Sequence, residues 1–263
     1  MAKKVRTKSL FPSTPKEHIR QLVEWMSQGV YEKEQIIAVA LLCAVAGENM
    51  FLLGPPGTAK SMVSSRLKMV FKDGKSFDYL MSRFSTPDEI FGPISISRLK
   101  NDDRYERLTA GYLPEADVVF LDEIWKAGPS IQNTLLTVIN EHIFHNGGQI
   151  MRTPMKVLIA ASNELPAKDE GLEALWDRFL VRMVSNCIES DTSFFKMIKG
   201  AGVDMSELSE SLYITDETYS NWQNESKTVG IQDSVVSAIK NIRKSLTALE
   251  KEDGNQLRYY ISD

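Results

Sequence analysis

The chain has 263 residues, of which 43 % are hydrophobic, and its formal net charge is −4 at pH 7. This length can hold one medium domain and a small second one, and the hydrophobic content is enough for a buried core. Both signs of charge are spread along the sequence, so no basic field favours a nucleic-acid partner. Cys43 and Cys187 stand in apolar surroundings and match neither a metal-site spacing nor a disulfide framework, which favours a reducing cytoplasm.

The N-terminal part predicts no secretory or membrane segment. It is basic, but it lacks the apolar core and the small-residue cleavage site of a secretory signal. The longest apolar stretch, residues 36–47, is too short to span a bilayer. We therefore expect a cytoplasmic location without membrane insertion.

Two helices are predicted before the first strand. One begins at Pro15, and its amphipathic spacing places four apolar side chains on one side, namely Ile19, Leu22, Val23 and Met26. A turn at residues 29–31 follows. Residues 32–46 predict a second helix, buried on most of its surface because alanine, valine and leucine dominate it. Residues 1–30 thus form a helical lead-in to the main domain.

A phosphate-binding loop is predicted between the apolar strand 50–53 and the helical pattern that follows it. The loop consists of Gly54, Pro55, Pro56, Gly57, Thr58, Ala59, Lys60 and Ser61. In such a loop, unpaired main-chain N–H groups converge at the positive end of a helix, where a triphosphate supplies the missing acceptors. Lys60 would reach the β and γ phosphates, and the Ser61 hydroxyl would ligate Mg²⁺. Ala59 replaces the usual second spacing glycine, and we expect it to have a negative φ in the first helical turn.

Two carboxylates follow a second buried strand. The apolar run that begins at Asp117 ends in Asp122 and Glu123, as expected for a parallel strand covered on both faces. Asp122 would hold Mg²⁺ through water, and Glu123 would polarise the attacking water. Adjacent acids at a strand end are common surface features by themselves, but the preceding phosphate-binding loop favours the catalytic interpretation.

A third buried strand, residues 156–162, ends at Asn163. The Asn163 amide could orient the nucleophilic water and sense the γ phosphate, or it could be an ordinary turn residue after a strand. With a further strand at residues 77–81, the pattern predicts an α/β fold whose sheet has about five parallel strands, with helices on both faces.

An arginine lies among apolar residues further along the chain. Arg178 is flanked by Leu175, Trp176 and Phe179, which should anchor it rigidly. An arginine inserted into a neighbouring subunit's nucleotide site accelerates phosphoryl transfer by roughly 10³- to 10⁵-fold. The alternative is an ion pair within the chain, with Asp177 or Glu173.

Two segments look inserted into this core. The first is residues 90–113. The second, residues 142–154, has the pattern of a hairpin with a tight glycine turn at residues 146–148. His142 and His145 have no nearby carboxylate or cysteine to complete a metal site. With few basic residues and no interleaved aromatics, the hairpin does not favour DNA translocation.

Several of these motifs together resemble the AAA+ ATPases, more narrowly the MoxR family, and within it the regulatory ATPase variant A branch. The motifs are GPPGTAKS at 54–61, MSRFSTPDEIFGP at 81–93, RYERLTAGYLPEADVVFLDE at 104–123, FLDEIWKAGP at 120–129, AASNELP at 160–166 and LWDRFLVR at 175–182. The resemblance covers most of the chain. Alanine at position 59 is common in this family, so it does not indicate an inactive loop.

The resemblance implies a site and an assembly. ATP and Mg²⁺ would bind at Lys60 and Ser61, and a homohexameric ring would form. Asp122 and Glu123 would be the Walker B pair and Asn163 the first sensor. Arg178 would be the arginine finger, with Arg182 as the second choice. Val30 and Tyr31 are candidates for contact with the adenine ring, although an ordinary loop that anchors an aromatic explains them equally well.

The resemblance also implies a domain division and a function. Residues 31–185 would form the AAA+ P-loop NTPase core, and residues 186–263 the start of a small all-α lid that ends before a second sensor arginine. The two inserted segments resemble loops that point into a central pore, with simple surface loops as the alternative. The implied function is ATP-driven remodelling or chaperone-like maturation of a protein client, possibly one with a von Willebrand factor A (vWA) domain. Two rival functions remain open: a nucleotide-dependent interaction switch with negligible turnover, and a DNA-dependent motor.

Overall fold

The computed structural model describes residues 14–167, 171–200 and 206–253. The chain divides into two compact units, Met1–Tyr219 and Ser220–Asp263. The first unit holds the sheet and all the predicted site residues. The predicted boundary between core and lid near residue 185 lies inside this first unit and stays a prediction.

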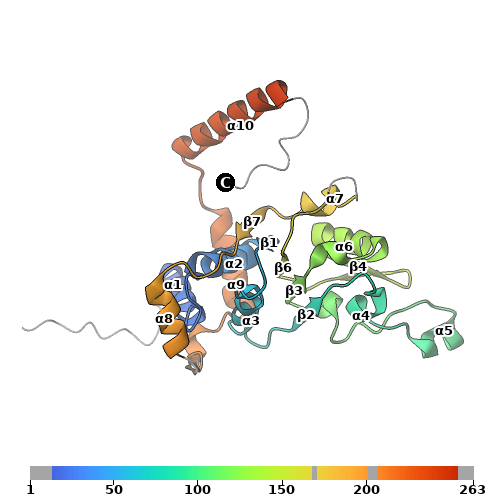
Figure 1. The fold of residues 1–263 in the computed structure, drawn as a ribbon. Coiled ribbons are helices and arrows are strands. Elements are labelled where there is room, and N and C mark those ends of the chain that lie inside the picture. Colours follow the sequence, from blue (N-terminus) through green and yellow to red (C-terminus); the bar gives the residue numbers. More distant parts are fainter. Residues whose placement is uncertain (1–13, 168–170, 201–205, 254–263) are drawn as a thin grey trace, which may run out of the picture. The chain divides into compact units, whose positions relative to one another are not determined.

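A five-stranded parallel sheet forms the centre of the first unit (Figure 1). The strand order is β2-β3-β6-β1-β7, and each neighbouring pair is parallel. The strands are β1 (Met50–Leu53), β2 (Ser76–Leu80), β3 (Val118–Asp122), β6 (Val157–Ser162) and β7 (Val181–Val184). The predicted α/β class is confirmed. Sequence patterns locate four of these strands, and β7 is the one that they miss.

Burial follows position in the sheet. All six residues of β6 are buried. The first four residues of β3 are buried, and its last residue, Asp122, is half-buried. The edge strand β2 instead alternates between exposed and half-buried residues. Because all strands are parallel, their carboxyl ends share one edge, where Leu53 pairs with Ser162 and Leu80 with Asp122. The loops that leave this edge carry the predicted site.

Helices cover both faces of the sheet (Figure 1). On one side lie α1 (Pro15–Met26), α2 (Glu34–Ala46) and α3 (Lys60–Lys68), and on the other lie α4 (Pro87–Phe91) and α6 (Pro129–Glu141). The two helices predicted before the first strand are confirmed as α1 and α2. In α1, however, the buried residues are His18, Leu22, Trp25 and Met26. The expected Ile19 is 37 % exposed, because the packed side is centred on His18, which bonds the main-chain oxygen of Leu212.

An aromatic cluster connects the first strand to the segments that carry the acids and the arginine. Phe51 of β1 is 1 % exposed. Its ring lies 5.2 Å from that of Trp125, 5.1 Å from that of Trp176 and 5.9 Å from that of Phe179. Such contacts between ring edges and faces add to the free energy of apolar burial. Phe51 therefore anchors both the segment that follows Glu123 and the residues on either side of Arg178.

The remaining elements are short helices, a hairpin and two longer helices. The hairpin consists of β4 (Ile143–Asn146) and β5 (Gln149–Arg152), as predicted. The helices are α5 (Ile96–Asp102), α7 (Glu173–Trp176), α8 (Asp191–Lys199), α9 (Asp216–Lys227) and α10 (Asp233–Asp253), with 3₁₀ turns η1 (Leu113–Glu115), η2 (Ile124–Lys126) and η3 (Glu210–Leu212). Within the described ranges, no helix is both long enough and apolar enough to cross a membrane.

Candidate functional site

The phosphate-binding loop holds the Lys60 side chain inside the protein. Lys60 is 6 % exposed. Its Nζ donates to the main-chain oxygen of Gly54 at 2.5 Å, to that of Pro55 at 3.0 Å and to the Oδ1 of Asn163 at 3.0 Å. Each ammonium proton thus has an acceptor, and a buried charge is tolerated when it is hydrogen-bonded in this way. A phosphate oxygen would take the place of one of these acceptors.

Close main-chain packing fixes the shape of the loop. A Cβ on Gly54 would lie 2.3 Å from the main-chain oxygen of Ser185, so only glycine fits there. The Ser185 hydroxyl donates to the main-chain oxygen of Thr58 at 2.8 Å, and the Thr58 hydroxyl donates to that of Pro55 at 2.9 Å. The loop is therefore pre-formed against the end of β7.

The expectation of a negative φ at Ala59 is wrong. Ala59 has φ 65° and ψ 19°, in the left-handed region, and helix α3 begins one residue later, at Lys60. The loop needs this backbone conformation to turn into the helix, which is why glycine usually stands there. For a residue with a Cβ, the conformation costs about 1 to 2 kcal/mol.

The acids and the amide meet the lysine at the carboxyl edge of the sheet. Asn163 donates through Nδ2 to the Oε1 of Glu123 at 2.6 Å while its Oδ1 accepts from Lys60. Glu123 has φ 53°, and its main-chain N–H donates to the Oδ1 of Asp122 at 3.0 Å. Its second oxygen lies 3.2 Å from the Nζ of Lys126. Asn163 is therefore more than a turn residue, because its amide connects the lysine to the acid.

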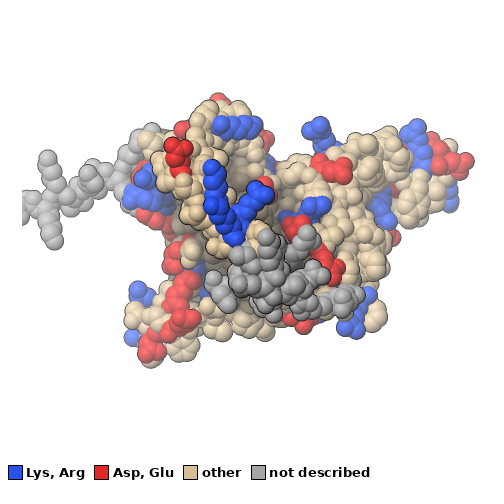
Figure 2. Space-filling model, turned by 90° about the horizontal axis from the view of Figure 1, so that it is seen from above, with Lys and Arg blue, Asp and Glu red and all other residues tan. Residues whose placement is uncertain are grey.

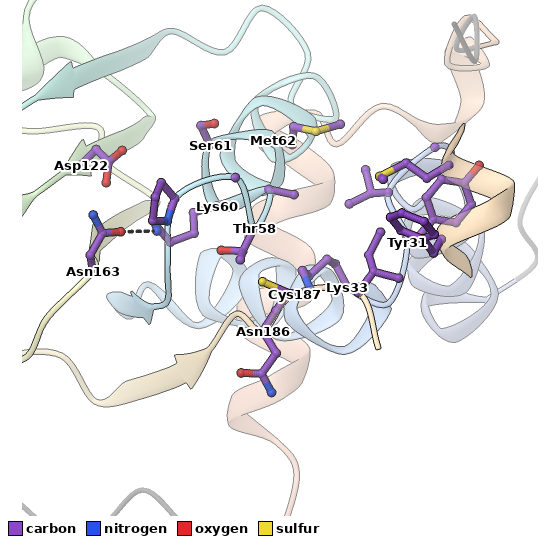
Figure 3. A pocket seen from close by; sticks show the side chains of 18 of the residues that line it. Tyr31, Lys33, Thr58, Lys60, Ser61, Met62, Asp122, Asn163, Asn186 and Cys187 are labelled. Atoms are coloured by element: carbon purple, nitrogen blue, oxygen red, sulfur yellow. Dashed lines mark hydrogen bonds between the residues drawn. The ribbon is translucent and has the colours of Figure 1, made fainter. Parts of the chain in front are cut away.

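These groups line one cavity of about 620 Å³ (Figure 3). Its volume is within the range of pockets that enclose small molecules. The predicted site residues on its wall are Val30, Tyr31, Pro56, Gly57, Thr58, Ala59, Lys60, Ser61, Asp122, Glu123 and Asn163. Gly54 and Pro55 lie behind the wall, where their main-chain oxygens accept from Lys60. Arg178 is not among the lining residues.

The cavity has a second wall that sequence reasoning missed. It includes Gly29, Lys33, Met62, Leu80, Asn186, Cys187, Ile188, Phe194 and Met197. Lys33 is 4 % exposed and donates to the main-chain oxygen of Asn186 at 2.6 Å. Met62 and Gly29 adjoin predicted site residues, whereas the others lie far from the loop in sequence and only the fold brings them to it.

The two cysteines have different surroundings. Cys43 is buried, as expected, and burial raises the pKa of its thiol to about 11. Cys187 is exposed and lines the cavity, so the expectation of apolar surroundings is wrong for it. It lies on the segment between β7 and α8, where residues 186–188 form part of the cavity wall.

The oxygen groups at the phosphate end fit Mg²⁺. The Ser61 hydroxyl and the Asp122 carboxylate both line the cavity, and Mg²⁺ is usually held by one or two such groups together with substrate phosphates and water. Within the part of the chain that the structure describes, no cluster of three or more His, Cys, Asp or Glu residues could hold a metal ion by itself. A magnesium site here would thus depend on the nucleotide.

The two candidate finger arginines differ in their contacts. Arg178 follows α7 and is exposed. Among the described residues its guanidinium makes no ion pair, neither with Asp177 nor with Glu173. Arg182 instead donates to the main-chain oxygens of Phe179 at 2.9 Å and Trp176 at 3.0 Å, and it lies 4.0 Å from the centre of the Trp176 ring. Burial lowers the pKa of Arg182. Of the two, Arg178 is therefore the arginine whose guanidinium is exposed and without an ion pair among the described residues.

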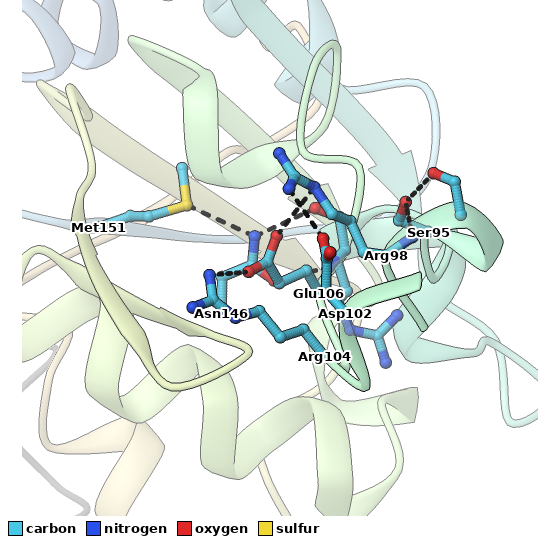
Figure 4. Close-up of polar contacts among 9 residues, drawn as sticks. Ser95, Arg98, Asp102, Arg104, Glu106, Asn146 and Met151 are labelled. Carbon is cyan, nitrogen blue, oxygen red and sulfur yellow. Dashed lines mark hydrogen bonds and ion pairs between the residues drawn. The ribbon is translucent and has the colours of Figure 1, made fainter. Parts of the chain in front are cut away.

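The two inserted segments contact each other (Figure 4). Asn146 at the hairpin turn accepts from the main-chain N–H of Arg107 at 2.6 Å and donates to its main-chain oxygen at 3.0 Å. A Cβ on Gly147 would lie 2.4 Å from the Cγ of Glu106, so the hairpin tip packs closely on the first segment. Glu106 lies 3.7 Å from both Arg98 and Arg104. The two insertions form one packed body.

Comparison with known families finds a profile that matches most of the chain. The sequence profile described as the MoxR domain in the MoxR-vWA-beta-propeller ternary systems matches residues 17–223. The chain belongs to the MoxR family. This MoxR domain is also similar to the protein described as Chaperone MoxR1 of Mycobacterium tuberculosis, with 28 % identity over 57 % of this chain and 40 % of that protein.

Other relatives support the fold. Two uncharacterized proteins of Methanocaldococcus jannaschii are 38 % and 40 % identical over 93 % and 84 % of this MoxR chain. The chain spans 60 % and 58 % of their lengths. The crystal structure of a candidate ATPase from Cytophaga hutchinsonii matches with a TM-score of 0.69 and 17 % identity, over 87 % of this chain and 68 % of that one. This structural match shows that the two chains share a fold.

Proposed function

We propose that this MoxR chain binds Mg²⁺-ATP in the cavity and hydrolyses it to ADP and phosphate. The observation that carries the proposal is the connected set Lys60, Asn163 and Glu123 on the wall that also presents Ser61 and Asp122. A cation for phosphate, oxygen ligands for magnesium and a carboxylate for water are the groups that phosphoryl transfer to water needs.

Each residue has a distinct role in this proposal. Lys60 exchanges the Asn163 oxygen for the β and γ phosphates, and the main-chain N–H groups of residues 57–61 donate to the remaining phosphate oxygens. Bound Mg²⁺, held by Ser61 and Asp122, would neutralise phosphate charge. Glu123 accepts a proton from the attacking water, and Asn163, already bonded to Glu123, orients that water.

A contact with adenine and an arginine from another subunit complete the proposed site. Val30 and Tyr31 lie on the cavity wall away from the loop and would contact adenine. Arg178 is exposed and outside its own cavity, so it can act only in the site of another copy. We therefore propose a homo-oligomeric ring, a hexamer by family resemblance, in which each subunit supplies the finger to its neighbour.

Mixing two inactive variants tests this arrangement. Glu123→Gln removes the acid, and Arg178→Ala removes the finger, so each alone should be inactive. Their mixture should regain part of the wild-type turnover, because some interfaces then pair an intact acid with an intact arginine. Near-normal turnover by Arg178→Ala alone would contradict the finger assignment. Loss of turnover without recovery in the mixture would contradict a shared site.

The proposed role of hydrolysis is remodelling of a partner protein. The family description names vWA systems, so we propose a vWA-domain protein as the client. The packed body formed by residues 90–113 and 142–154 would transmit the motion to it. We retain the regulatory ATPase variant A branch as the placement within the family. A purified vWA partner that stimulates ATP turnover would support the role, and an unchanged rate at saturating partner would contradict it.

A titration distinguishes the alternatives. Turnover that rises steeply with protein concentration indicates a shared site, whereas tight ATP binding without turnover at any concentration indicates a switch. A DNA-dependent motor would show salt-sensitive stimulation by nucleic acid. Basic and acidic side chains both occur on the face shown in Figure 2, and the formal net charge of the chain is −4. That distribution favours a protein client.

A further inference from the structure

Helix α8 forms part of the cavity wall although it is poorly anchored by its own side chains. None of its residues, Asp191–Lys199, is buried. Phe194 and Met197 line the cavity and are 44 % and 43 % exposed. A wall of this kind needs another group to hold it, because exposed apolar side chains contribute little burial free energy. The contacts of the preceding segment identify that group.

Two neighbouring residues before α2 hold the start of α8. The Glu32 carboxylate accepts from the main-chain N–H of Glu189 at 2.8 Å and from that of Ser190 at 3.1 Å. Ser190 is the N-cap of α8, and its own side chain makes no capping bond. Lys33 holds the same segment through the main-chain oxygen of Asn186 at 2.6 Å. Glu32 thus accepts from the N–H groups of the N-cap residue and of the residue before it, and so ties the start of α8 to the turn before α2.

The backbone and the charge of Glu32 suit this task. Its φ is 59°, a conformation that is uncommon for residues with a Cβ and that persists where surrounding contacts enforce it. Bonds from the main-chain N–H of Glu189 and the side chain of Ser193 lower the pKa of Glu32. The carboxylate is therefore charged at neutral pH, and a negative charge at a helix N-terminus is favourable.

We propose that Glu32 is a positioning residue for nucleotide binding, which holds α8 against the cavity so that Phe194 and Met197 cover the base end of the nucleotide. This inference rests on the proposed ATP site. Glu32 touches neither phosphate nor water in this scheme, so its loss should act on affinity and release. Chemistry at Glu123 should be unaffected, because the Lys60, Asn163 and Glu123 set lies at the other end of the cavity.

The test measures release of a fluorescent ATP analogue, the KM for ATP, and kcat. In Glu32→Ala we expect release to be faster and KM higher by about 10-fold, the equivalent of losing one charge-assisted hydrogen bond, with kcat within about 2-fold of wild type. Hydrogen exchange at the amides of Glu189 and Ser190 should accelerate as well. Glu34→Ala, an exposed acid two residues away, is the matched control and should behave as wild type.

A second pair of variants changes exposed side chains of α8 itself. Phe194 and Phe195 are neighbours on α8 and both are exposed, but only Phe194 lines the cavity. Phe194→Ala should reproduce the fast release, and Phe195→Ala should not. Normal binding by wild type together with unchanged release in Glu32→Ala and Phe194→Ala would overturn this inference alone. Failure of wild type to bind the analogue would overturn the ATP site, and this inference with it.

Discussion

The Lys60 ammonium and the Asn163 amide are joined by a hydrogen bond of 3.0 Å across the carboxyl edge of the sheet. Lys60 belongs to α3 and Asn163 follows β6. The bond means that a phosphate competes with Asn163 for the lysine. Binding of a triphosphate would thus free the Asn163 oxygen while the same amide remains beside Glu123.

This relationship predicts a separation of affinity from rate in Asn163→Ala. Turnover should fall by roughly 100-fold, the usual effect of losing one oriented hydrogen-bonding group in an active site. Affinity for ATP should not fall, because the substitution removes an acceptor that competes for Lys60. Phosphate release and analogue binding measure the two quantities. Asn133→Ala, an exposed residue on α6, is the control, and weaker binding with normal turnover in Asn163→Ala would refute the assignment.

The two arginines after α7 should give opposite phenotypes. Arg178→Ala should reduce turnover by about 10³-fold or more and leave thermal stability unchanged, since the side chain is exposed and unpaired among the described residues. Arg182→Ala should lower the free energy of unfolding by about 2 kcal/mol, because it removes two bonds to main-chain oxygens and the contact with the Trp176 ring.

Calorimetry and turnover assays on the same preparations test the contrast between the two arginines. Each variant serves as the control for the other, since both remove one guanidinium from the same short segment. An Arg178→Ala protein that melts early, or an Arg182→Ala protein that is fully stable but inactive, would reverse the two assignments. The finger would then be Arg182.

Thiol labelling reports on the cavity. Burial raises the pKa of the Cys43 thiol to about 11, so at pH 8 only about 10⁻³ of Cys43 is thiolate, the form that reacts. Labelling should therefore come from the exposed Cys187. Mg²⁺-ATP should slow it, because Cys187 lines the cavity. Cys187→Ser should abolish the fast reaction, and Cys43→Ser should leave it intact. Labelling that ATP does not alter would place the nucleotide elsewhere.

The local motifs predicted the phosphate end of the site, whereas at the base end the family resemblance offered only Val30 and Tyr31. Parallel strands bring their carboxyl ends to one edge, so a loop after β1, acids after β3 and Asn163 after β6 had to converge. The base end depends on contacts such as Lys33 with Asn186, 153 positions apart, which no local pattern encodes. The positive φ of Ala59 could not be predicted from the sequence either. The geometry of the loop imposes it, against the ordinary preference of alanine for negative φ.

Adjacent glycines at the hairpin turn provide the last prediction. Gly147 and Gly148 have φ of 57° and 89°, so alanine at either position carries a backbone cost of about 1 kcal/mol. Only at Gly147 would the new Cβ also collide, at 2.4 Å with the Cγ of Glu106 and at 2.7 Å with the main-chain oxygen of Tyr105. A Cβ on Gly148 meets nothing within 4 Å.

Gly147→Ala should therefore lose about 1 to 3 kcal/mol more than Gly148→Ala in urea unfolding. It should also expose the Arg107 amide, which donates to the Oδ1 of Asn146, to hydrogen exchange. If the packed body of the two insertions transmits motion to a client, stimulation of turnover by that client should fall in Gly147→Ala, with basal turnover retained. Equal stability and equal Arg107 protection in the two variants would mean that the hairpin and the first insertion move independently.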